Sequence, residues 1–271
     1  MTAEKAFQII DRYKPTLFFA VPTLYAGMLQ VPHAEKKYDL RSVRSAVSAG
    51  EALPAALWEK FRTRFGIELL DGIGSTEMLH IFISNRPGDV IPGSSGKPVP
   101  GYAAKITDEQ GRELRDREIG NLWIRGESAA AGYWNRPDRT TATFVGEWTM
   151  TGDKYIRDEK GYLWYCGRSD DMLKVSGLWV SPVEIESALL EHPAVVECAV
   201  VGACDSDGLT KPKAFVVPKT VSSALEQLEA EIREFLKEKL AGYKVPRWIV
   251  FVESLPKTAT GKIQRFKLRV S

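Results

Sequence analysis

Cysteine is scarce in this sequence of 271 residues, with only Cys166, Cys198 and Cys204 present. Their number is odd, and no two of them form a Cys-x-x-Cys pair. Neither a disulfide framework nor a cysteine-based zinc site is therefore indicated. We expect reduced thiols in a cytoplasmic protein.

Long apolar runs are also missing, because none approaches the ~18 residues that a membrane-spanning helix requires. The first ten residues, MTAEKAFQII, lack the basic region followed by an apolar region that marks a signal peptide. Charge of one sign is not in excess either, since 37 Lys and Arg stand against 35 Asp and Glu, a formal net charge of +2. We therefore expect neither a membrane nor a nucleic acid as a partner.

What is present is the material of a globular protein, with 44% hydrophobic and 27% charged residues. Helical spacing and strand-like runs alternate in residues 1–90, with helices expected at 3–13, 22–28 and 54–65 and strands at 16–21, 42–50 and 67–70. This alternation predicts a parallel α/β sheet, with Thr2 as the cap of the first helix. Ligands of such sheets gather at the carboxyl ends of the strands, where Gly50 and the glycine-rich loop 72–77 fall.

Residues 91–169 have a different sequence pattern, in which β-prone runs such as AAKIT (103–107) and GNLWIRG (120–126) alternate with turn residues. This predicts an antiparallel β-rich subdomain, so that residues 1–169 form one large domain. Residues 170–271 then form a small α+β domain, whose first helix begins with a capping box of Ser181, Pro182 and Glu184. The charged stretch GRSDDMLKVSG (167–177) lies at the border and is interpreted as an interdomain hinge.

Four places along the chain could carry chemistry, and each also has an ordinary structural explanation. In GSTEM (74–78), Thr76 could hold a phosphate oxygen and Glu77 could hold Mg²⁺, or the two could cap a helix. In TGDKY (151–155), Asp153 could bind both hydroxyls of a ribose or form an Asx-turn. Arg168 could support the same sugar or its phosphate, or pair with an acid at the surface. Lys262, in a loop of small residues, could reach into a cleft or lie at the surface.

The order and spacing of these motifs resemble the carboxyl-terminal half of the acyl- and aryl-CoA synthetases, members of the adenylate-forming superfamily. Within it, the segments DGIGSTEMLHIFISNRPGDVIPGSSGKPVPGY (71–102) and GRSDDMLKVSGLWVSP (167–182) look similar to benzoate-CoA ligases. The resemblance covers essentially the whole chain. It implies an ATP-dependent ligase that converts benzoate or a substituted benzoate, ATP and CoA into aryl-CoA, AMP and diphosphate through an aryl-adenylate.

The resemblance implies individual roles in binding ATP and Mg²⁺. Gly50, Glu51 and Ala52 would lie against the adenine. The adenine and the α-phosphate would be wrapped by Asp71, Gly72, Ile73, Gly74, Ser75 and Thr76, with Glu77 near Mg²⁺. Asp153 would bind the ribose hydroxyls, supported by Arg168. Thr76, Glu77 and Lys262 would be the catalytic residues, with Lys262 delivered by the small domain for adenylation.

Further positions are implied for the acid and for CoA. The aryl pocket would contain Gly74, His80 and Ile81, although a buried core histidine is the alternative for His80. Asp170 would be the hinge about which the small domain turns as a mobile lid. After adenylation the lid would withdraw Lys262 and line the CoA tunnel with Lys174, Ser176 and Gly177.

One element of the family pattern, the Ser/Thr/Gly-rich phosphate loop, is absent from the sequence. It belongs to an amino-terminal half, which we expect as a missing partner, so that this chain would be a fragment that catalyses poorly by itself. The resemblance also leaves room for a homodimer. Trp179 stands where short-chain acyl-CoA synthetases often have a basic residue, and no role is assigned to it.

Three other functions stay open. The chain could adenylate another carboxylic acid for CoA or for a carrier protein. It could be a non-catalytic nucleotide- or CoA-binding fragment, which the absent phosphate loop favours and the presence of Asp153, Glu77 and Lys262 disfavours. Seven basic residues against one acid after Ala241 could indicate a nucleic-acid-binding tail. Their scatter without stacking aromatic residues favours the phosphates of ATP and CoA instead.

Overall fold

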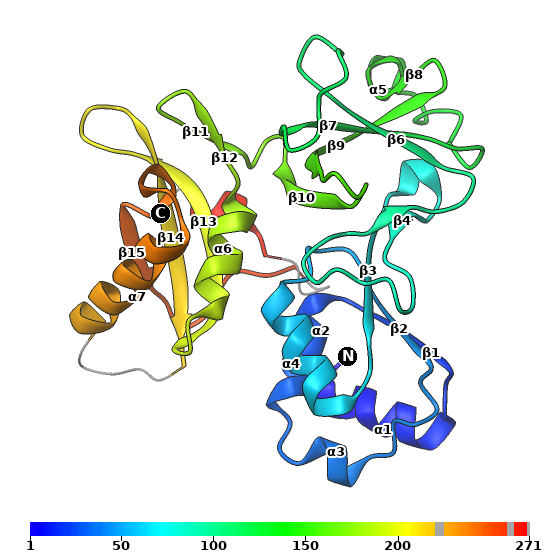
Figure 1. The fold of residues 1–271 in the computed structure, drawn as a ribbon, viewed down its shortest axis with the longest axis vertical. Helices are drawn as coiled ribbons and strands as arrows, with labels where there is room; N and C mark the ends of the chain where they lie inside the picture. Colours follow the sequence, from blue (N-terminus) through cyan, green and yellow to red (C-terminus); the bar gives the residue numbers. More distant parts are fainter. Residues whose placement is uncertain (220–224, 259–262, 270–271) are drawn as a thin grey trace. The chain divides into compact units, whose positions relative to one another are not determined.

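Figure 1 shows the computed structural model of the chain, which describes residues 1–219, 225–258 and 263–269. The chain forms two compact units, Met1–Tyr165 and Cys166–Ser271. Their division lies next to the charged stretch 167–177, while the domain boundaries expected at residues 90 and 169 stay predictions. No helix in the described part of the chain is long and apolar enough to cross a bilayer.

The first unit begins with a sheet of five strands, in the order β1 (Leu17–Ala20), β2 (Ser45–Ser48), β3 (Leu69–Gly74), β4 (Ile81–Ser84) and β5 (Lys97–Pro98). β1, β2 and β3 pair in parallel, as the sequence predicts. β4 and β5, which the sequence analysis did not predict, extend this sheet with antiparallel pairing. The connection between β3 and β4 is too short for the crossover that a parallel neighbour needs.

Helices pack against this sheet: α1 (Ala3–Tyr13), α2 (Pro22–Gln30), α3 (Ala34–Lys37) and α4 (Ala55–Phe65). The predicted cap of α1 is confirmed, since Thr2 Oγ1 accepts a hydrogen bond from Lys5 N at 3.2 Å. One cluster of buried side chains, which includes Phe7 and Phe61, fills the space between the helices and the strands. α4 is also bonded to β3, because Trp58 Nε1 donates to the carbonyl O of Leu69 at 2.8 Å.

β3 continues through the glycine-rich segment that the sequence predicts as a loop. Gly72 lies opposite Ser84, and Gly74 lies opposite Ile81. A Cβ atom on Gly74 would lie 2.3 Å from the carbonyl O of His80, so only glycine allows this approach of the backbones. The loop prediction for 72–77 is therefore wrong at its start. The loop consists of residues 75–80 and contains the short 3-10 turn η1 (Thr76–Met78).

The rest of the first unit is a second sheet, in the order β10 (Leu163–Arg168), β9 (Trp148–Arg157), β7 (Gly120–Arg125) and β6 (Ala103–Thr107). β8 (Phe144–Val145) pairs with β9, and α5 (Pro137–Thr143) precedes it. The predicted antiparallel arrangement is confirmed for β6, β7, β8 and β9. The last residues of β10 lie beyond the division between the two units.

Asp153 lies within β9 and not in the turn that its sequence context predicts. Between two regular pairs of β7 and β9, the three residues 151–153 lie opposite the single residue Leu122. Such a β-bulge bends the strand and re-aims its side chains. Thr151 stabilises it, because its Oγ1 donates to Leu122 O at 3.2 Å and accepts from Asp153 N at 3.1 Å.

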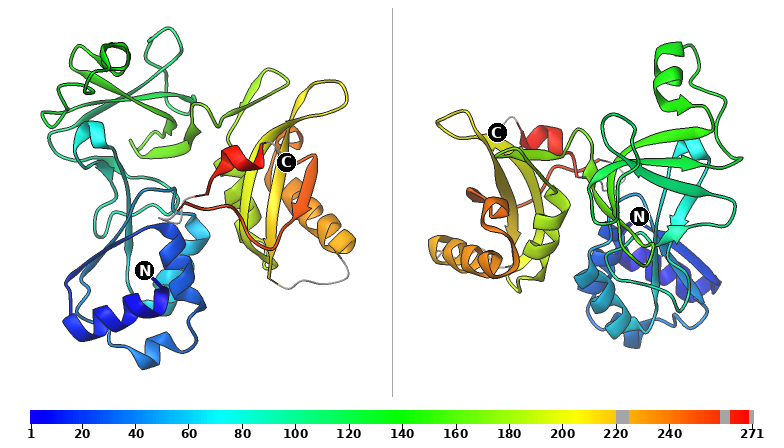
Figure 2. Two further views of the ribbon diagram at one scale, coloured as in Figure 1. Left: turned by 180° about the vertical axis from the view of Figure 1, so that it is seen from behind. Right: turned by 45° about the horizontal axis from the view of Figure 1, so that its top comes forward.

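The second unit is built on a three-stranded sheet, in the order β13 (Val195–Cys204), β14 (Thr210–Pro218) and β15 (Trp248–Phe251). β13 pairs antiparallel and β15 parallel with β14. α6 (Pro182–Glu191) and α7 (Leu225–Lys239) pack on one face, where Val200 and Ile232 share a buried cluster. The view from behind in Figure 2 shows α8 (Arg265–Leu268) on the other face, where Leu268 packs with Val201. The turn η2 (Gly242–Lys244) precedes β15.

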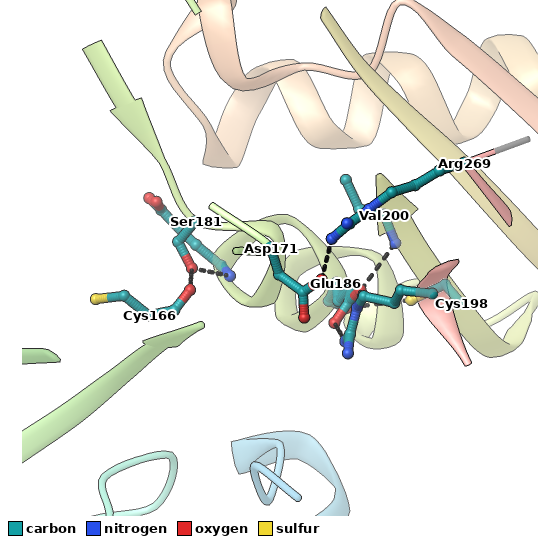
Figure 3. A network of polar contacts seen from close by, with 9 residues as sticks. Cys166, Asp171, Ser181, Glu186, Cys198, Val200 and Arg269 are labelled. Atoms are coloured by element: carbon teal, nitrogen blue, oxygen red, sulfur yellow. Dashed lines mark hydrogen bonds and ion pairs between the residues drawn. The ribbon is translucent and has the colours of Figure 1, made fainter. Parts of the chain in front are cut away.

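The start of α6 is only partly as predicted. Ser181 is the N-cap, and its Oγ accepts a hydrogen bond from Glu184 N at 3.1 Å. The reciprocal half of the capping box is wrong, because the Glu184 carboxylate accepts from Lys244 Nζ at 2.6 and 2.8 Å. Ser181 Oγ also donates to Cys166 O at 2.5 Å, which ties α6 to the beginning of the second unit (Figure 3).

The charged stretch 167–177 enters a hairpin that the sequence analysis missed. β11 (Leu173–Val175) pairs antiparallel with β12 (Leu178–Val180). The two connecting residues, Ser176 and Gly177, have φ values of 51° and 84°. Two residues with positive φ form a type I′ turn, which suits the twist of a tight hairpin.

Candidate functional site

The two segments expected to bind adenine lie side by side in the first unit. Ser48, the last residue of β2, pairs with Asp71 in β3, and the turn 50–52 follows β2 directly. Gly50 has a φ of 92°, which favours glycine. Glu51 is held in the turn, since its Oε2 accepts a hydrogen bond from Thr23 Oγ1 at 3.0 Å.

Asp71 presents a buried oxygen without a partner. The residue is 5% exposed, and its Oδ1 forms no hydrogen bond with any described residue. Burial raises the pKa of Asp71 well above its ordinary value, and the main-chain N–H groups of Gly72 and Leu53 oppose this effect. Because an unpaired buried acceptor costs free energy, a donor such as the amino group of an adenine would be stabilised here.

Asp153 is brought to the same region by the bulge in β9. It is 7% exposed and lies two residues before the buried Tyr155, whose hydroxyl is 3.0 Å from Ser95 Oγ. The pKa of Tyr155 is raised well above its ordinary value, mainly by burial, and the nearby charges of Asp153 and Asp71 add to the shift. Two of the predicted ATP-binding carboxyl groups thus contribute to the pKa of the same tyrosine.

Glu77 is held by the segment between β7 and α5. The hydroxyl of Tyr133 donates to Glu77 Oε1 at 2.5 Å, and Ala130 N donates to Glu77 O at 2.8 Å. The alternative that Thr76 and Glu77 cap a helix is wrong, because the N-cap of η1 is Ser75, without a side-chain cap bond. Tyr133 was missed by the sequence analysis, since no local pattern links it to a residue 56 positions away.

The described residues contain no cluster of three or more His, Cys, Asp or Glu side chains that could hold a metal unaided. Mg²⁺ in nucleotide sites is usually bound through one or two carboxylates together with the phosphates. Glu77, with its carboxylate fixed by Tyr133, can supply such a ligand.

The residues expected in the aryl pocket meet where β3 and β4 approach each other. Gly74 lies against the backbone of His80, and Ile81 begins β4. His80 is exposed, so the alternative of a core histidine is wrong. Its ring faces that of Phe19 in β1, with centroids 6.5 Å apart at an interplanar angle of 69°. Phe19 was missed because its strand was expected to be buried, whereas its side chain is 56% exposed.

Arg168 and Asp170 lie at the beginning of the second unit. Arg168 Nε is 4.0 Å from Asp170 Oδ1, and the two side chains are 52% and 80% exposed. Main-chain hydrogen bonds from Asp171 N and Met172 N to Arg168 O close the turn, at 3.0 and 3.1 Å. An exposed turn can absorb a change of φ and ψ, as a hinge requires. The expected contact of Arg168 with the ribose stays a prediction.

The residues expected to line the CoA tunnel lie on the β11–β12 hairpin. Lys174 Nζ is 5.7 Å from the centroid of the Trp179 ring. Gly177 is explained by the positive φ of the turn, so the passage of CoA beside it and beside Ser176 stays a prediction. The predicted catalytic Lys262 lies outside the residues that the structure describes.

A basic hollow of about 460 Å³ adjoins this hairpin and was missed by the sequence analysis. Ser176 lines it together with four basic residues, Lys211, Arg233, Lys237 and Arg247. Arg233 and Lys237 have acidic partners within α7. Lys211 and Arg247 form no ion pair within the described residues, so their charges are available to an anionic ligand. Arg233 and Lys237 lie in α7, Lys211 lies in β14 and Arg247 directly precedes β15, so no single sequence spacing connects the set.

Two family models match the chain along its sequence. The family model described as AMP-binding enzyme matches residues 1–134. The model described as AMP-binding enzyme C-terminal domain matches residues 184–262. The chain belongs to the AMP-binding enzymes of the adenylate-forming superfamily, which confirms the resemblance.

Individual relatives act on, or are named for, aromatic acids. The chain is 56% identical to a benzoate–CoA ligase of Thauera aromatica, over 99% of this chain and 51% of the relative. A solved anthranilate CoA ligase in complex with anthranoyl-AMP has a TM-score of 0.94 and 54% identity, over 99% of this chain and 52% of that one. A benzoate CoA ligase from Burkholderia xenovorans has a TM-score of 0.91 and 52% identity, over 99% and 54%. The chain therefore spans about half the length of these relatives.

Proposed function

We propose that this chain is the carboxyl-terminal half of an ATP-dependent aryl-CoA ligase. The complete enzyme would convert benzoate or a substituted benzoate, ATP and CoA into aryl-CoA, AMP and diphosphate. The observation that carries the proposal is the buried Asp71, which pairs with Ser48 just before the turn 50–52 and has a carboxylate oxygen without a partner among the described residues. The names of the relatives support an aromatic acid as the substrate.

The first step is the attack of a carboxylate oxygen of the acid on the α-phosphorus of ATP. The bond from this phosphorus to the bridging oxygen breaks, and diphosphate leaves with the electron pair. Negative charge grows on the oxygens, so donors and cations that are fixed in advance stabilise the transition state most. The Thr76 hydroxyl would be such a donor, and the Lys262 ammonium would contact both the carboxylate and the bridging oxygen.

Glu77 would hold Mg²⁺, which when bound supplies positive charge beside the phosphates. The hydrogen bond from Tyr133 keeps the Glu77 carboxylate in one orientation for this purpose. Asp153 would accept hydrogen bonds from the two ribose hydroxyls, and the bulge in β9 fixes its direction. These residues act by placing ATP and not by transferring protons.

The second step is the attack of the CoA thiolate on the acyl carbon of the aryl-adenylate, in which AMP leaves with the electrons of the broken bond. The basic hollow beside Ser176 suits the phosphates of CoA, because Lys211 and Arg247 have charges available there. This favours free CoA over a carrier protein, whose phosphopantetheine arm has a single phosphate. The second unit would turn about Asp170 between the two steps, as a lid.

The proposal includes a cytoplasmic location, which the absence of disulfides among the free Cys166, Cys198 and Cys204 supports. It also includes an amino-terminal half that carries the phosphate loop, because the chain spans only about half of each relative. A homodimer stays a prediction from the resemblance alone.

The test compares this chain with the same chain joined to its amino-terminal half. With ATP, Mg²⁺ and benzoate, we expect the complete protein to release diphosphate and the chain alone to release none. Addition of CoA is expected to give benzoyl-CoA and AMP, while a phosphopantetheinyl carrier gives no product. No benzoate-dependent diphosphate from the complete protein would contradict the ligase, and tight ATP binding by the chain alone would favour a non-catalytic module.

A further inference from the structure

A buried ion pair in the second unit lies outside the ATP-, acid- and CoA-binding segments. Glu186 of α6 is 8% exposed, and its Oε1 accepts a hydrogen bond from Val200 N of the edge strand β13 at 2.8 Å (Figure 3). Arg265, the first residue of α8, completes the pair. Its Nη2 donates to the two carboxylate oxygens at 2.8 and 3.0 Å, and its Nε donates to Oε1 at 3.3 Å.

Stability alone is a poor explanation for this pair. Buried ion pairs are often no more stabilising than apolar side chains of similar size, because both charges lose their hydration. What such a pair does provide is direction, since the planar guanidinium fork of Arg265 meets both oxygens of Glu186 in one geometry. The pair is therefore better explained by the part of the chain that it orients.

That part consists of the described residues before and after Lys262 in the sequence, from Lys257 to Arg265. Lys257 and Ile263, which are described residues before and after Lys262, form an isolated β-bridge. Lys257 Nζ also pairs with Glu197 Oε1 of β13 at 2.6 Å. Beyond the bridge, Arg265 fixes the chain to α6. The described residues that flank Lys262 are thus attached to the unit at both ends of the segment.

We propose that Glu186 and Arg265 are positioning residues for Lys262. They hold the chain three residues after the lysine and so set the direction from which its ammonium group enters the first step. The inference rests on the proposed function, in which Lys262 serves adenylation and is withdrawn before the thioester forms. The pair therefore acts on the first step alone, whereas a pair that only stabilises the fold would affect both steps.

The experiment measures the two half-reactions separately in the complete enzyme. Arg265→Lys keeps the charge but removes the planar fork, and Glu186→Gln keeps the shape and the bond from Val200 N. We expect each variant to lower benzoate-dependent diphosphate release by about 10- to 100-fold, the effect of a slightly misplaced catalytic group. CoA-dependent release of AMP from benzoyl-adenylate supplied in advance is expected to stay within about twofold of the wild-type rate.

Lys239→Gln is the matched control, because it removes another ion pair to α6, that of Lys239 with Glu191 at the far end of the helix. Both half-reactions of this variant are expected to match the wild type. Thermal unfolding is measured for each protein, and Glu186→Gln provides the test if Arg265→Lys does not fold. Equal losses in both half-reactions overturn the inference.

The wild-type enzyme separates this inference from the proposed function. A wild type that makes no benzoate-dependent diphosphate overturns the proposed function and the inference with it. An active wild type with variants that adenylate at its rate overturns the inference alone.

Discussion

The two units hold their functional segments with different interactions. In the first unit, the buried side chain of Asn85 links β3 to the loop after β4 by neutral hydrogen bonds. Its Nδ2 donates to Asp71 O of β3 at 3.3 Å and to Ser94 O at 2.7 Å, and its Oδ1 accepts from Ile91 N at 3.2 Å. In the second unit, ion pairs hold the corresponding segments: Asp171 pairs with Arg269 (Figure 3), and Glu186 pairs with Arg265. A buried neutral network keeps one geometry, since a lost partner has no replacement. The partly exposed charge of Arg269 can exchange its partner for water, which would suit the lid movement proposed for the second unit.

The largest expected effect comes from Gly74→Ala, which removes the close contact of β3 with β4. The added Cβ would lie within 2.7 Å of three backbone atoms of His80 and Ile81, which cannot yield as a side chain can. We expect benzoate-dependent diphosphate release to fall by at least about 100-fold in the complete enzyme. Gly27→Ala is the control, because its Cβ would meet only Ala3 at 3.6 Å within a helix. An active Gly74→Ala enzyme would contradict the rigid placement of this segment.

Asn85→Ala tests the neutral network directly. It removes the partners of Ser94 O and Ile91 N inside the first unit, so we expect the free energy of unfolding to fall by about 2 to 4 kcal/mol. Urea unfolding of the 271-residue chain at low and high salt measures this. The loss is expected to be the same at both salt concentrations, because no charge is involved. A loss of unfolding free energy that becomes smaller in high salt would contradict the proposed difference between the two units, because it would indicate charged interactions in the first unit.

Arg269→Gln is the charged counterpart, with a smaller effect. Arg269 Nη2 donates to the Asp170 carbonyl O at 3.0 Å and pairs with the Asp171 carboxylate near the proposed hinge. Because the Arg269 side chain is 39% exposed, we expect a loss of unfolding free energy of at most about 1 kcal/mol, and less in high salt. The same urea series measures it, and a large loss independent of salt would show that the second unit is held as rigidly as the first.

The smallest effect is a pH dependence confined to the second unit. Burial lowers the pKa of His192, opposed by the charge of Glu231, and the ring packs against Phe235 with centroids 5.1 Å apart. As the pH falls through about 6.5, the unfolded chain takes up a proton before the folded chain does, so the free energy of unfolding decreases. Urea midpoints between pH 7.5 and 5.5 are expected to show this decrease, and His192→Gln is expected to reduce it. If the urea midpoint of His192→Gln depends on pH as strongly as that of the wild type, groups other than His192 cause the decrease.

Local chemistry accounts for the parts of the fold that the sequence predicts. The caps at Thr2 and Ser181 depend on hydrogen bonds to residues three positions away, and both are present. The strand β3 shows the limit of such reasoning. Its glycines favour a loop by propensity, but the approach of β4 draws them into the sheet.

The candidate site shows the same limit. Asp71, Asp153 and Glu77 could be singled out from their motifs, because their type and order carry the family pattern. The partner of Glu77 could not, since Tyr133 lies 56 residues away from it. Nor could the pair of Glu186 and Arg265, which are 79 residues apart. Such pairs exist only after the chain has folded, and no periodicity of the sequence encodes them.

The position of β1 in its sheet has a practical consequence for work with this chain in solution. Within the described residues β1 pairs only with β2, so one row of its backbone N–H and C=O groups faces outward beside the exposed Leu17 and Phe19. An open strand edge with apolar side chains is a template for a strand of another molecule. We therefore expect the separate chain to self-associate through β1 at high concentration. A segment that pairs with the open edge of β1 would prevent this association.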